Sequence, residues 1–377
     1  MSTRVKINND LITWAIDRAD YELPKFIEEK FPQVEDWIHN KKKPTIIQLR
    51  DFAKKVHLPF GYLFLDTPPK EKLPIPYYRT LKGKTNEVSL NVREVILTLE
   101  KRQGWLRDYL IDNENNPLDF VGKYDKHTDN HIIINDIRKI LGFNEYWSEE
   151  ISSWRNAKNH LKNKFEDAGI FIVSSSYVGL NTRRKITVEE CRGFVLVDQY
   201  APFMFINSAD SLSAQIFTLI HELAHLWIGE SAGFDFSNFQ PSENDVEKKC
   251  NEIAAEFLAP AELFNGFWKI NEDFKWLAER FKVSPIVAAR RALDLDKISK
   301  RRFFDFYNAY TKEFDEKEKN NNSNGNFYNS LKSKLNSRFL SLVDRAVKED
   351  QLLYQDAFEL TGLRGKTYDK AIKKLNA

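Results

Sequence analysis

One motif, HELAH at residues 221–225, constrains this 377-residue chain more than any other feature. It lies in an apolar run that predicts a helix over 211–228. Residues i and i+4 of a helix share one face, so His221 and His225 can bind a single metal ion. Glu222 lies one residue round the helix, from where its carboxylate can act as a general base toward a water molecule on that metal. A chain of this length with seven histidines is expected to contain on the order of 0.01 such motifs by chance. The alternative to a metal site is a pair of hydrogen-bonded histidines on a core helix.

A catalytic zinc ion needs a third protein ligand, which leaves the fourth position for water. The helix predicted over 243–258 offers candidates. Glu247 lies at the margin of its buried stripe and can face inward, so it is the favoured ligand. Glu243, one turn earlier on the same stripe, and Cys250, whose thiolate would give a softer site, are the competitors. Asn251 could hydrogen-bond the free ring nitrogen of a zinc-binding histidine, or it could be an ordinary surface amide.

Other polar residues of these segments are expected to have structural or solvated roles. Glu252 and Glu256 are rotated away from the inward stripe of the same helix, so both are expected to be solvated. Arg192 and Asn207 lie at the ends of predicted strands, and each is expected to be structural or solvated rather than catalytic. An edge strand beside the metal helix could hold an extended peptide through main-chain hydrogen bonds.

Composition is typical of a globular protein of the cytoplasm. Hydrophobic residues make up 42% and charged residues 30% of the chain, as in a globular protein, and the length of 377 residues suits two or three domains. The net charge of +2 gives the whole molecule no strong attraction to nucleic acid or membrane, so such a partner needs a local patch. Cys191 and Cys250 are the two cysteines, which excludes a disulfide framework and suits a reducing compartment. The sequence shows neither a signal-peptide pattern nor an apolar window long enough to span a membrane.

Residues 1–66 predict an all-helical N-terminal domain. Its short amphipathic helices are interrupted by the basic run Lys41, Lys42 and Lys43, and this pattern suggests a DNA-binding helix-turn-helix. The alternative is a helix bundle, because a run of three lysines is usually a solvated face. Four prolines in residues 67–80 then predict an extended linker.

The remaining residues predict a helix-rich α+β region followed by further helices. Residues 81–295 begin with helical spacing and then change period. Three short strands are expected there, at 170–176, 192–198 and 201–208. Helical spacing returns over 296–377, interrupted by a polar, low-complexity loop at 316–326. The expected fold class is therefore α+β, with a helical head, a core with a short β-sheet and a helical tail.

Four segments in order resemble the ImmA/IrrE metallo-endopeptidases, a zincin group found in bacteria and mobile elements. They are RGFVLVD, APFMFINS, AQIFTLIHELAHLWIGES and EKKCNEIAAEFLAP. The resemblance implies a gluzincin-like domain that holds Zn²⁺ on His221, His225 and Glu247, with Glu222 as the catalytic base. Cys250 stands where alanine is usual in the family, and this departure should affect packing more than chemistry.

The resemblance extends to both ends of the chain. Residues 14–65 and the PPKEKLPIPYYRT that follows are similar to the Xre-type helix-turn-helix of longer members, which implies double-stranded DNA as a partner. Residues 338–370 resemble the tail of the same members. The family implies a DNA-associated zinc endopeptidase that cleaves a specific partner protein, a transcriptional repressor or a toxin. The alternative is a DNA-binding autorepressor or antitoxin whose zincin domain recognises a partner with little or no proteolysis.

Overall fold

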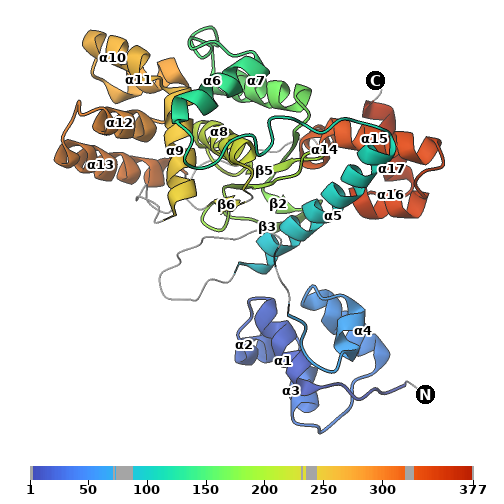
Figure 1. The fold of residues 1–377 in the computed structure, drawn as a ribbon. Helices are drawn as coiled ribbons and strands as arrows, with labels where there is room; N and C mark the ends of the chain where they lie inside the picture. Colours follow the sequence, from blue (N-terminus) through green and yellow to red (C-terminus); the bar gives the residue numbers. More distant parts are fainter. Residues whose placement is uncertain are drawn as a thin grey trace. The chain divides into compact units, whose positions relative to one another are not determined.

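The chain forms two compact units (Figure 1). The computed structural model describes residues 3–70, 73, 88–230, 232–234, 244–318 and 327–375. Of these, residues 3–70, 73 and 88–94 fall in the first unit and those from 95 onward in the second. The predicted linker lies mostly outside the described residues, and its described part, 67–70 and 73, forms neither helix nor strand.

The first unit is helical, as the spacing of its apolar residues predicted. Its elements are α1 (Asn9–Arg18), α2 (Leu23–Glu29), α3 (Gln33–Ile38), α4 (Ile46–Lys55) and the 3-10 helix η1 (Phe60–Phe64). Phe52 of α4 lies in the apolar core, and its ring centroid is 6.0 Å from that of Phe26 and 5.9 Å from that of Trp37. These edge-on aromatic contacts join α2, α3 and α4.

The second unit contains most of the helices. α5 (Leu90–Asp112) begins among residues of the first unit and continues into the second. The others are α6 (Asn130–Leu141), α7 (Trp154–Asp167), α8 (Leu212–Ile228), α9 (Asp245–Leu258), α10 (Ala261–Ile270), α11 (Phe274–Phe281), α12 (Pro285–Asp294), α13 (Lys300–Glu318), α14 (Phe327–Leu335), α15 (Ser337–Lys348), α16 (Tyr354–Thr361) and α17 (Lys366–Leu375). Among the described residues, no helix has the length and apolar character needed to cross a bilayer.

A four-stranded mixed sheet gives the second unit its α+β character. Its strands have the order β1-β5-β4-β6, and only β1 and β5 run parallel. They are β1 (Phe171–Ser175), β4 (Gly193–Leu196), β5 (Phe203–Asn207) and β6 (Ala232–Phe234). The three strands predicted from the sequence are therefore confirmed, as β1, β4 and β5.

Three short strands were not predicted. β2 (Tyr177–Val178) and β3 (Asn181–Lys185) form a separate antiparallel hairpin. β3 reads NTRRK, and it lacks the alternation of apolar and polar residues by which a half-buried strand is recognised. The third is β6, which has three residues.

Helix α8 lies in the core of the second unit. It packs against β4 and β5 and against the helices α7 and α9. Every residue from Gln215 to Ile228 is buried. Ser211 caps its start, and Gly229 ends it at a φ of 81°, where a Cβ would lie 2.8 Å from the Cα of Gly122. Polar residues on α8 are therefore shielded from water.

Some helix boundaries differ from those expected. Helical spacing of apolar residues extends over 146–168 and predicts a helix there, but α7 begins only at Trp154, because the Ser153 hydroxyl accepts a hydrogen bond from the first turn and caps it. The prediction of a loop at 316–326 is wrong for residues 316–318, because α13 continues to Glu318. The rest of that stretch lies outside the described residues. Helix α10 was not predicted.

The C-terminal helices pack on the second unit through β1 and α5. α14 lies against β1, which is an edge strand of the sheet. Next to α14, the fully buried Asn336 donates hydrogen bonds to the Ile172 carbonyl of β1 (3.2 Å) and to the Glu166 carboxylate (2.7 Å). Arg102 of α5 is buried as well, and its Nε donates to the Leu360 carbonyl of α16 at 2.8 Å. The tail is thus part of the same compact unit as the sheet.

Candidate metal centre

Three side chains of α8 and α9 converge in the core of the second unit. Nε2 of His221 lies 3.2 Å from Nε2 of His225 and 3.1 Å from Oε2 of Glu247. Oε1 of Glu247 lies 3.3 Å from Nε2 of His225. All three side chains are buried, and one ligand atom from each lies within 4.8 Å of the others. Three donor atoms around one point are the arrangement that binds a single metal ion.

Helix geometry and packing together produce this convergence. His221 and His225 are one turn apart on α8 and therefore share a face. α9 packs along α8 and is capped at its start by Asn244, whose side chain accepts a hydrogen bond from the Val246 amide. Glu247 lies in the first turn of α9 and is 4% exposed, so its carboxylate faces inward. The structure brings together the three residues that the sequence nominated as ligands.

Asn251 lies one helical turn after Glu247 and contacts His221. The Asn251 side-chain oxygen is 3.1 Å from Nδ1 of His221. An amide oxygen only accepts hydrogen bonds, so Nδ1 carries the proton and Nε2 is left with a lone pair. That lone pair points toward the Glu247 carboxylate, and two acceptors at this distance repel one another. A cation between them, either a proton or a metal ion, removes the repulsion.

Glu222 lies beside the cluster and is fully buried. Neither of its carboxylate oxygens has a hydrogen-bond partner among the described residues. Burial, reinforced by the negative charge of Glu247, raises the pKa of Glu222 well above its usual value. Because an unpartnered buried carboxyl group costs folding free energy, its presence suggests a chemical role.

The charges of the cluster are set by burial and by mutual contact. Burial lowers the pKa of His221, which favours the neutral imidazole that a metal ligand must be. Burial alone would raise the pKa of Glu247, but a proton on the facing nitrogens of His221 and His225 would hydrogen-bond the carboxylate, and this effect outweighs burial and holds the pKa of Glu247 well below its usual value. These two shifts favour a neutral imidazole at His221 and an ionised carboxylate at Glu247.

This donor set fits zinc. Two imidazole nitrogens and one glutamate oxygen form one of the common catalytic zinc sites, which keeps its fourth position open. Oε1 of Glu247 and both oxygens of Glu222 are buried without hydrogen-bond partners in the described part of the chain. A bound cation would explain the buried, unpartnered oxygen of Glu247 within the cluster. His221, His225 and Glu247 are the residues that would hold it.

A glycine of the sheet leaves room for the Glu222 carboxylate. A Cβ on Gly193 of β4 would lie 2.5 Å from the Thr218 methyl, 2.9 Å from the Phe205 carbonyl oxygen and 3.5 Å from Oε1 of Glu222. Only glycine therefore allows β4 to lie this close to α8. Sequence reasoning missed Gly193, although a glycine inside a strand pattern is a known signal of close backbone approach.

Of the two competitors for the third ligand position, the structure describes only Cys250. Glu243 lies outside the described residues. Cys250 is fully buried on α9 but is not among the converging ligand atoms, and burial raises the pKa of its thiol well above the usual value. Glu252 is exposed, as expected. The expectation that Glu256 is solvated is wrong, because its carboxylate pairs with Arg291 of α12.

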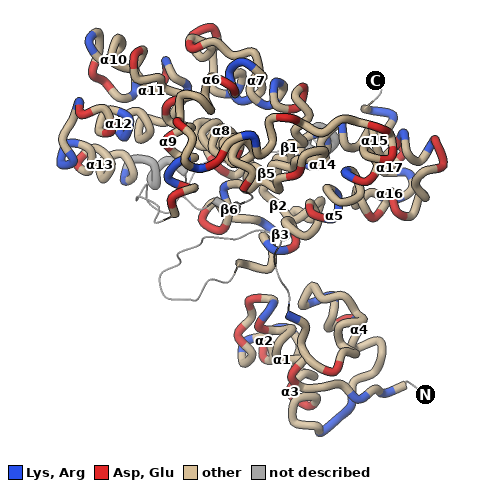
Figure 2. Tube along the Cα trace, in the orientation of Figure 1, with Lys and Arg blue, Asp and Glu red and all other residues tan. Residues whose placement is uncertain are grey.

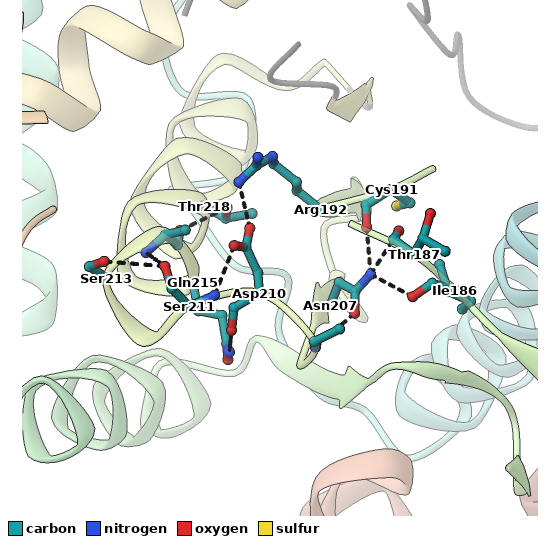
Figure 3. A network of polar contacts seen from close by, with 12 residues as sticks. Ile186, Thr187, Cys191, Arg192, Asn207, Asp210, Ser211, Ser213, Gln215 and Thr218 are labelled. Carbon is teal, nitrogen blue, oxygen red and sulfur yellow. Dashed lines mark hydrogen bonds and ion pairs between the residues drawn. The ribbon is translucent and has the colours of Figure 1, made fainter. Parts of the chain in front are cut away.

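Arg192 and Asn207 belong to a polar network beside the start of α8 (Figure 3). Asn207 is fully buried, and its amide nitrogen donates to three carbonyls, those of Ile186, Thr187 and Cys191, at 3.1, 3.1 and 2.8 Å. Arg192 pairs with Asp210 at 2.6 Å. Both residues join the loop before β4 to the segment that leads into α8, in agreement with the structural role expected of them.

The predicted DNA-contacting lysines lie in the first unit. Lys41, Lys42 and Lys43 are exposed and follow α3. Nζ of Lys42 lies 3.0 Å from Oδ2 of Asp36, which together with Glu35 makes the first turn of α3 acidic. The basic run is therefore partly offset by carboxylates next to it.

Two segments of the chain match known families. Residues 166–293 match the family model described as the IrrE N-terminal-like domain, Peptidase_M78. This segment makes up about a third of the chain and includes the whole cluster, so it is similar to a metallopeptidase domain. Residues 335–374 match a domain of unknown function, DUF8813. No curated protein matches the chain.

Proposed function

We propose that residues 166–293 form a zinc-dependent endopeptidase domain, which acts in the cytoplasm and cleaves one specific partner protein, a transcriptional repressor or a toxin. The observation that carries this proposal is the convergence of His221, His225 and Glu247 beside the unpartnered carboxylate of Glu222. The match to the IrrE N-terminal-like domain supports the same class of reaction. When bound, Zn²⁺ supplies Lewis-acid activation of a water molecule and of the peptide carbonyl.

The residues of the site have separate tasks in this reaction. His221, His225 and Glu247 hold the metal, and Asn251 fixes the ring of His221 through the Nδ1 proton. Glu222 takes a proton from the attacking water at one carboxylate oxygen and later delivers it to the nitrogen of the leaving amine. Because neither oxygen of Glu222 is engaged by another described residue, both are available for this transfer.

Metal content tests the site without knowledge of the substrate. The full-length native chain is expected to retain about one zinc ion per molecule, and His221→Ala is expected to lose it, since two remaining ligands do not form a tetrahedral site. Mass spectrometry of the purified proteins measures this ratio. A native chain that retains no metal after zinc is supplied at neutral pH would overturn the proposal.

Glu222→Gln tests the chemistry separately from metal binding. This variant keeps all three ligands, so it is expected to retain zinc and to lose proteolysis. The readout is the set of new protein N-termini in cells that express the native chain, Glu222→Gln, or the control Glu252→Gln at an exposed position of α9. New termini should occur with the native chain and the control only. The same termini with Glu222→Gln would refute the role of the base.

A binding protein is the alternative that the same variant identifies. If Glu222→Gln retains zinc and the full biological activity of the native chain, the domain would recognise a partner without cutting it. The protein would then be a DNA-binding autorepressor or antitoxin rather than a peptidase. Loss of that activity in Glu222→Gln, with zinc retained, would exclude this alternative.

We also propose that the N-terminal helical unit associates the domain with double-stranded DNA. The exposed side chains of Lys41, Lys42 and Lys43 support this role, although Asp36 reduces their field. Replacing all three lysines with alanine should lower the slope of log affinity against log salt by about 2 to 3, because each phosphate contact contributes about 0.9. Unchanged affinity and slope would exclude this corner as the DNA contact.

A further inference from the structure

A helical pair near the end of the chain has the form of a second helix-turn-helix. α16 and α17 are joined by the four residues 362–365, in which Gly362 and Gly365 have φ values of 70° and 45°. A short turn that contains glycine is typical of this motif. The pair lies within residues 335–374, which match a domain of unknown function.

Packing holds the two helices in a fixed arrangement. The Tyr368 ring of α17 is buried, with its centroid 6.4 Å from that of Tyr354 and 5.5 Å from that of Phe358, both on α16. α15 packs against both helices. Arg102 of α5 binds the Leu360 carbonyl near the end of α16. The outer face of α17 is therefore presented by a rigid support.

Helix α17 has one buried face and one basic face, and Figure 2 marks its lysines in blue along the backbone trace. Its buried face consists of Tyr368, Ala371 and Ile372. The exposed lysines of α17 recur every three or four residues and so share one face: they are Lys366, Lys370, Lys373 and Lys374. Residues 364–374 contain five basic residues and one acidic residue, a net charge of +4, whereas the whole chain has +2. Positive charge is thus concentrated on this helix.

Carboxylates on the neighbouring helices are partly neutralised by lysines. Glu359 of α16 lies 2.8 Å from Nζ of Lys101, and Asp344 of α15 lies 2.6 Å from Nζ of Lys348. Asp369 is the acidic residue on α17 itself. Asp356 lies in the first turn of α16. The excess of positive charge is therefore on the exposed lysine face of α17, which favours a polyanion as its partner.

Two other helix pairs in the described residues differ from this one. In α11 and α12, the second helix is packed into the core, with Ala288, Ala289 and Arg291 buried, so it cannot enter a groove. In α2 and α3, the second helix has six residues and carries Glu35 and Asp36. Helix α17 differs from α3 because it is longer, and it differs from α12 because more of it is exposed. Its exposed face is also basic.

We propose that α16 and α17 form a second DNA-binding module, in which α17 enters the major groove of double-stranded DNA. An α-helix with its side chains is about 10–12 Å across, and the major groove is about 12 Å wide. Lys366 and Lys373 are about 10 Å apart along the helix axis, at about 1.5 Å per residue. This spacing allows the lysines to contact phosphates along the groove.

The test uses the full-length chain and a labelled mixed-sequence duplex of about 20 base pairs, two helical turns. Lys366, Lys370 and Lys373 are replaced together by alanine, and a second variant carries glutamine at the same positions. Three exposed lysines elsewhere in the second unit, Lys139, Lys269 and Lys297, are replaced in the control, which loses the same charge. Each triple change is also made in a chain whose Lys41, Lys42 and Lys43 are alanine, so that the N-terminal contribution is removed.

Fluorescence anisotropy at a series of salt concentrations gives the affinity and its salt slope. The alanine and glutamine variants of α17 should both lower the slope by about 2.7 relative to the control, since three phosphate contacts are lost at about 0.9 each. When salt is raised from about 50 to about 200 mM, the DNA affinity of the native chain should therefore fall by a factor about 40 times larger than the affinity of the α17 variants does. The loss should persist when the N-terminal lysines are absent, which separates this module from the N-terminal unit.

Two outcomes would overturn the proposal. The first is a slope in the α17 variants equal to that of the control. The second is tighter binding of the native chain to an RNA duplex of the same sequence, which would identify RNA as the partner. Circular dichroism should show the native helix content in all variants, because the replaced side chains are exposed.

Discussion

Replacing Asn251 with alanine should weaken zinc binding although no ligand is removed. The Asn251 side-chain oxygen accepts the Nδ1 proton of the fully buried His221 at 3.1 Å. Asn251→Ala removes this hydrogen bond from a buried N–H, and the loss of such an acceptor costs about 1–3 kcal/mol. At about 1.4 kcal/mol per factor of ten, the expected loss is about 5- to 150-fold in affinity. This range agrees with the loss of about 10- to 100-fold that is typical when the outer partner of a metal-binding histidine is removed.

Competition with a chromophoric chelator at neutral pH measures the zinc affinity of the full-length chain. Glu252→Ala is the matched control, because Glu252 is exposed on the same helix and bonds Asn130 instead of the cluster. Asn251→Asp keeps an oxygen that accepts the Nδ1 proton, so its affinity should stay close to the native value. Native affinity in Asn251→Ala would refute the reasoning. An equal loss in Glu252→Ala would show instead that α9 is generally loosened.

Three further predictions concern packing and charge in the second unit. Gly193→Ala should destabilise the fold by about 1–3 kcal/mol in urea unfolding, because the new methyl overlaps that of Thr218. Gly266→Ala, whose added methyl meets no atom within 4 Å, should not, and equal losses would contradict this account. Burial lowers the pKa of Lys158 from 10.5 to about 8. Between pH values of about 8 and 10.5 the unfolded chain therefore binds more protons than the folded chain, so the free energy of unfolding rises with pH. Lys158→Met should flatten that rise, and identical pH profiles of the unfolding free energy would rule the effect out. Arg102→Met should cost about 1–3 kcal/mol, since the Leu360 carbonyl would lose its buried donor, and an unchanged urea midpoint would argue against that contact.

The local part of the site could be predicted because helix geometry determines it. His221 and His225 are one turn apart in any α-helix, so their common face does not depend on the tertiary fold. Glu247 required one further step, because the apolar stripe of α9 shows which side of that helix meets the core. Strands β1 and β5 could be predicted for a similar local reason, their content of β-branched and aromatic residues.

Features that depend on packing between distant segments could not be predicted. Glu256 was assigned to solvent from its position on α9, but the fold brings Arg291 of α12 to that side. Gly193 looks like an ordinary strand residue until β4 is placed against α8. The polar strand β3 carries no hydrophobic pattern at all. The zinc ion, the DNA contacts and the protein substrate remain predictions for the experiments described above.

The contact between Asn336 and β1 bears on self-association of the protein. Edge strands pair readily with strands of other molecules, and all five residues of β1 are buried in the folded chain. Here α14 covers this strand, and Asn336 binds the outward carbonyl of Ile172. A chain shortened to remove α14 to α17 should therefore form oligomers that light scattering detects, whereas the full chain does not form them through this edge. Such oligomers would show that the C-terminal helices protect the sheet edge from aggregation, independently of any partner that they bind, and a shortened chain that stays monomeric would contradict this.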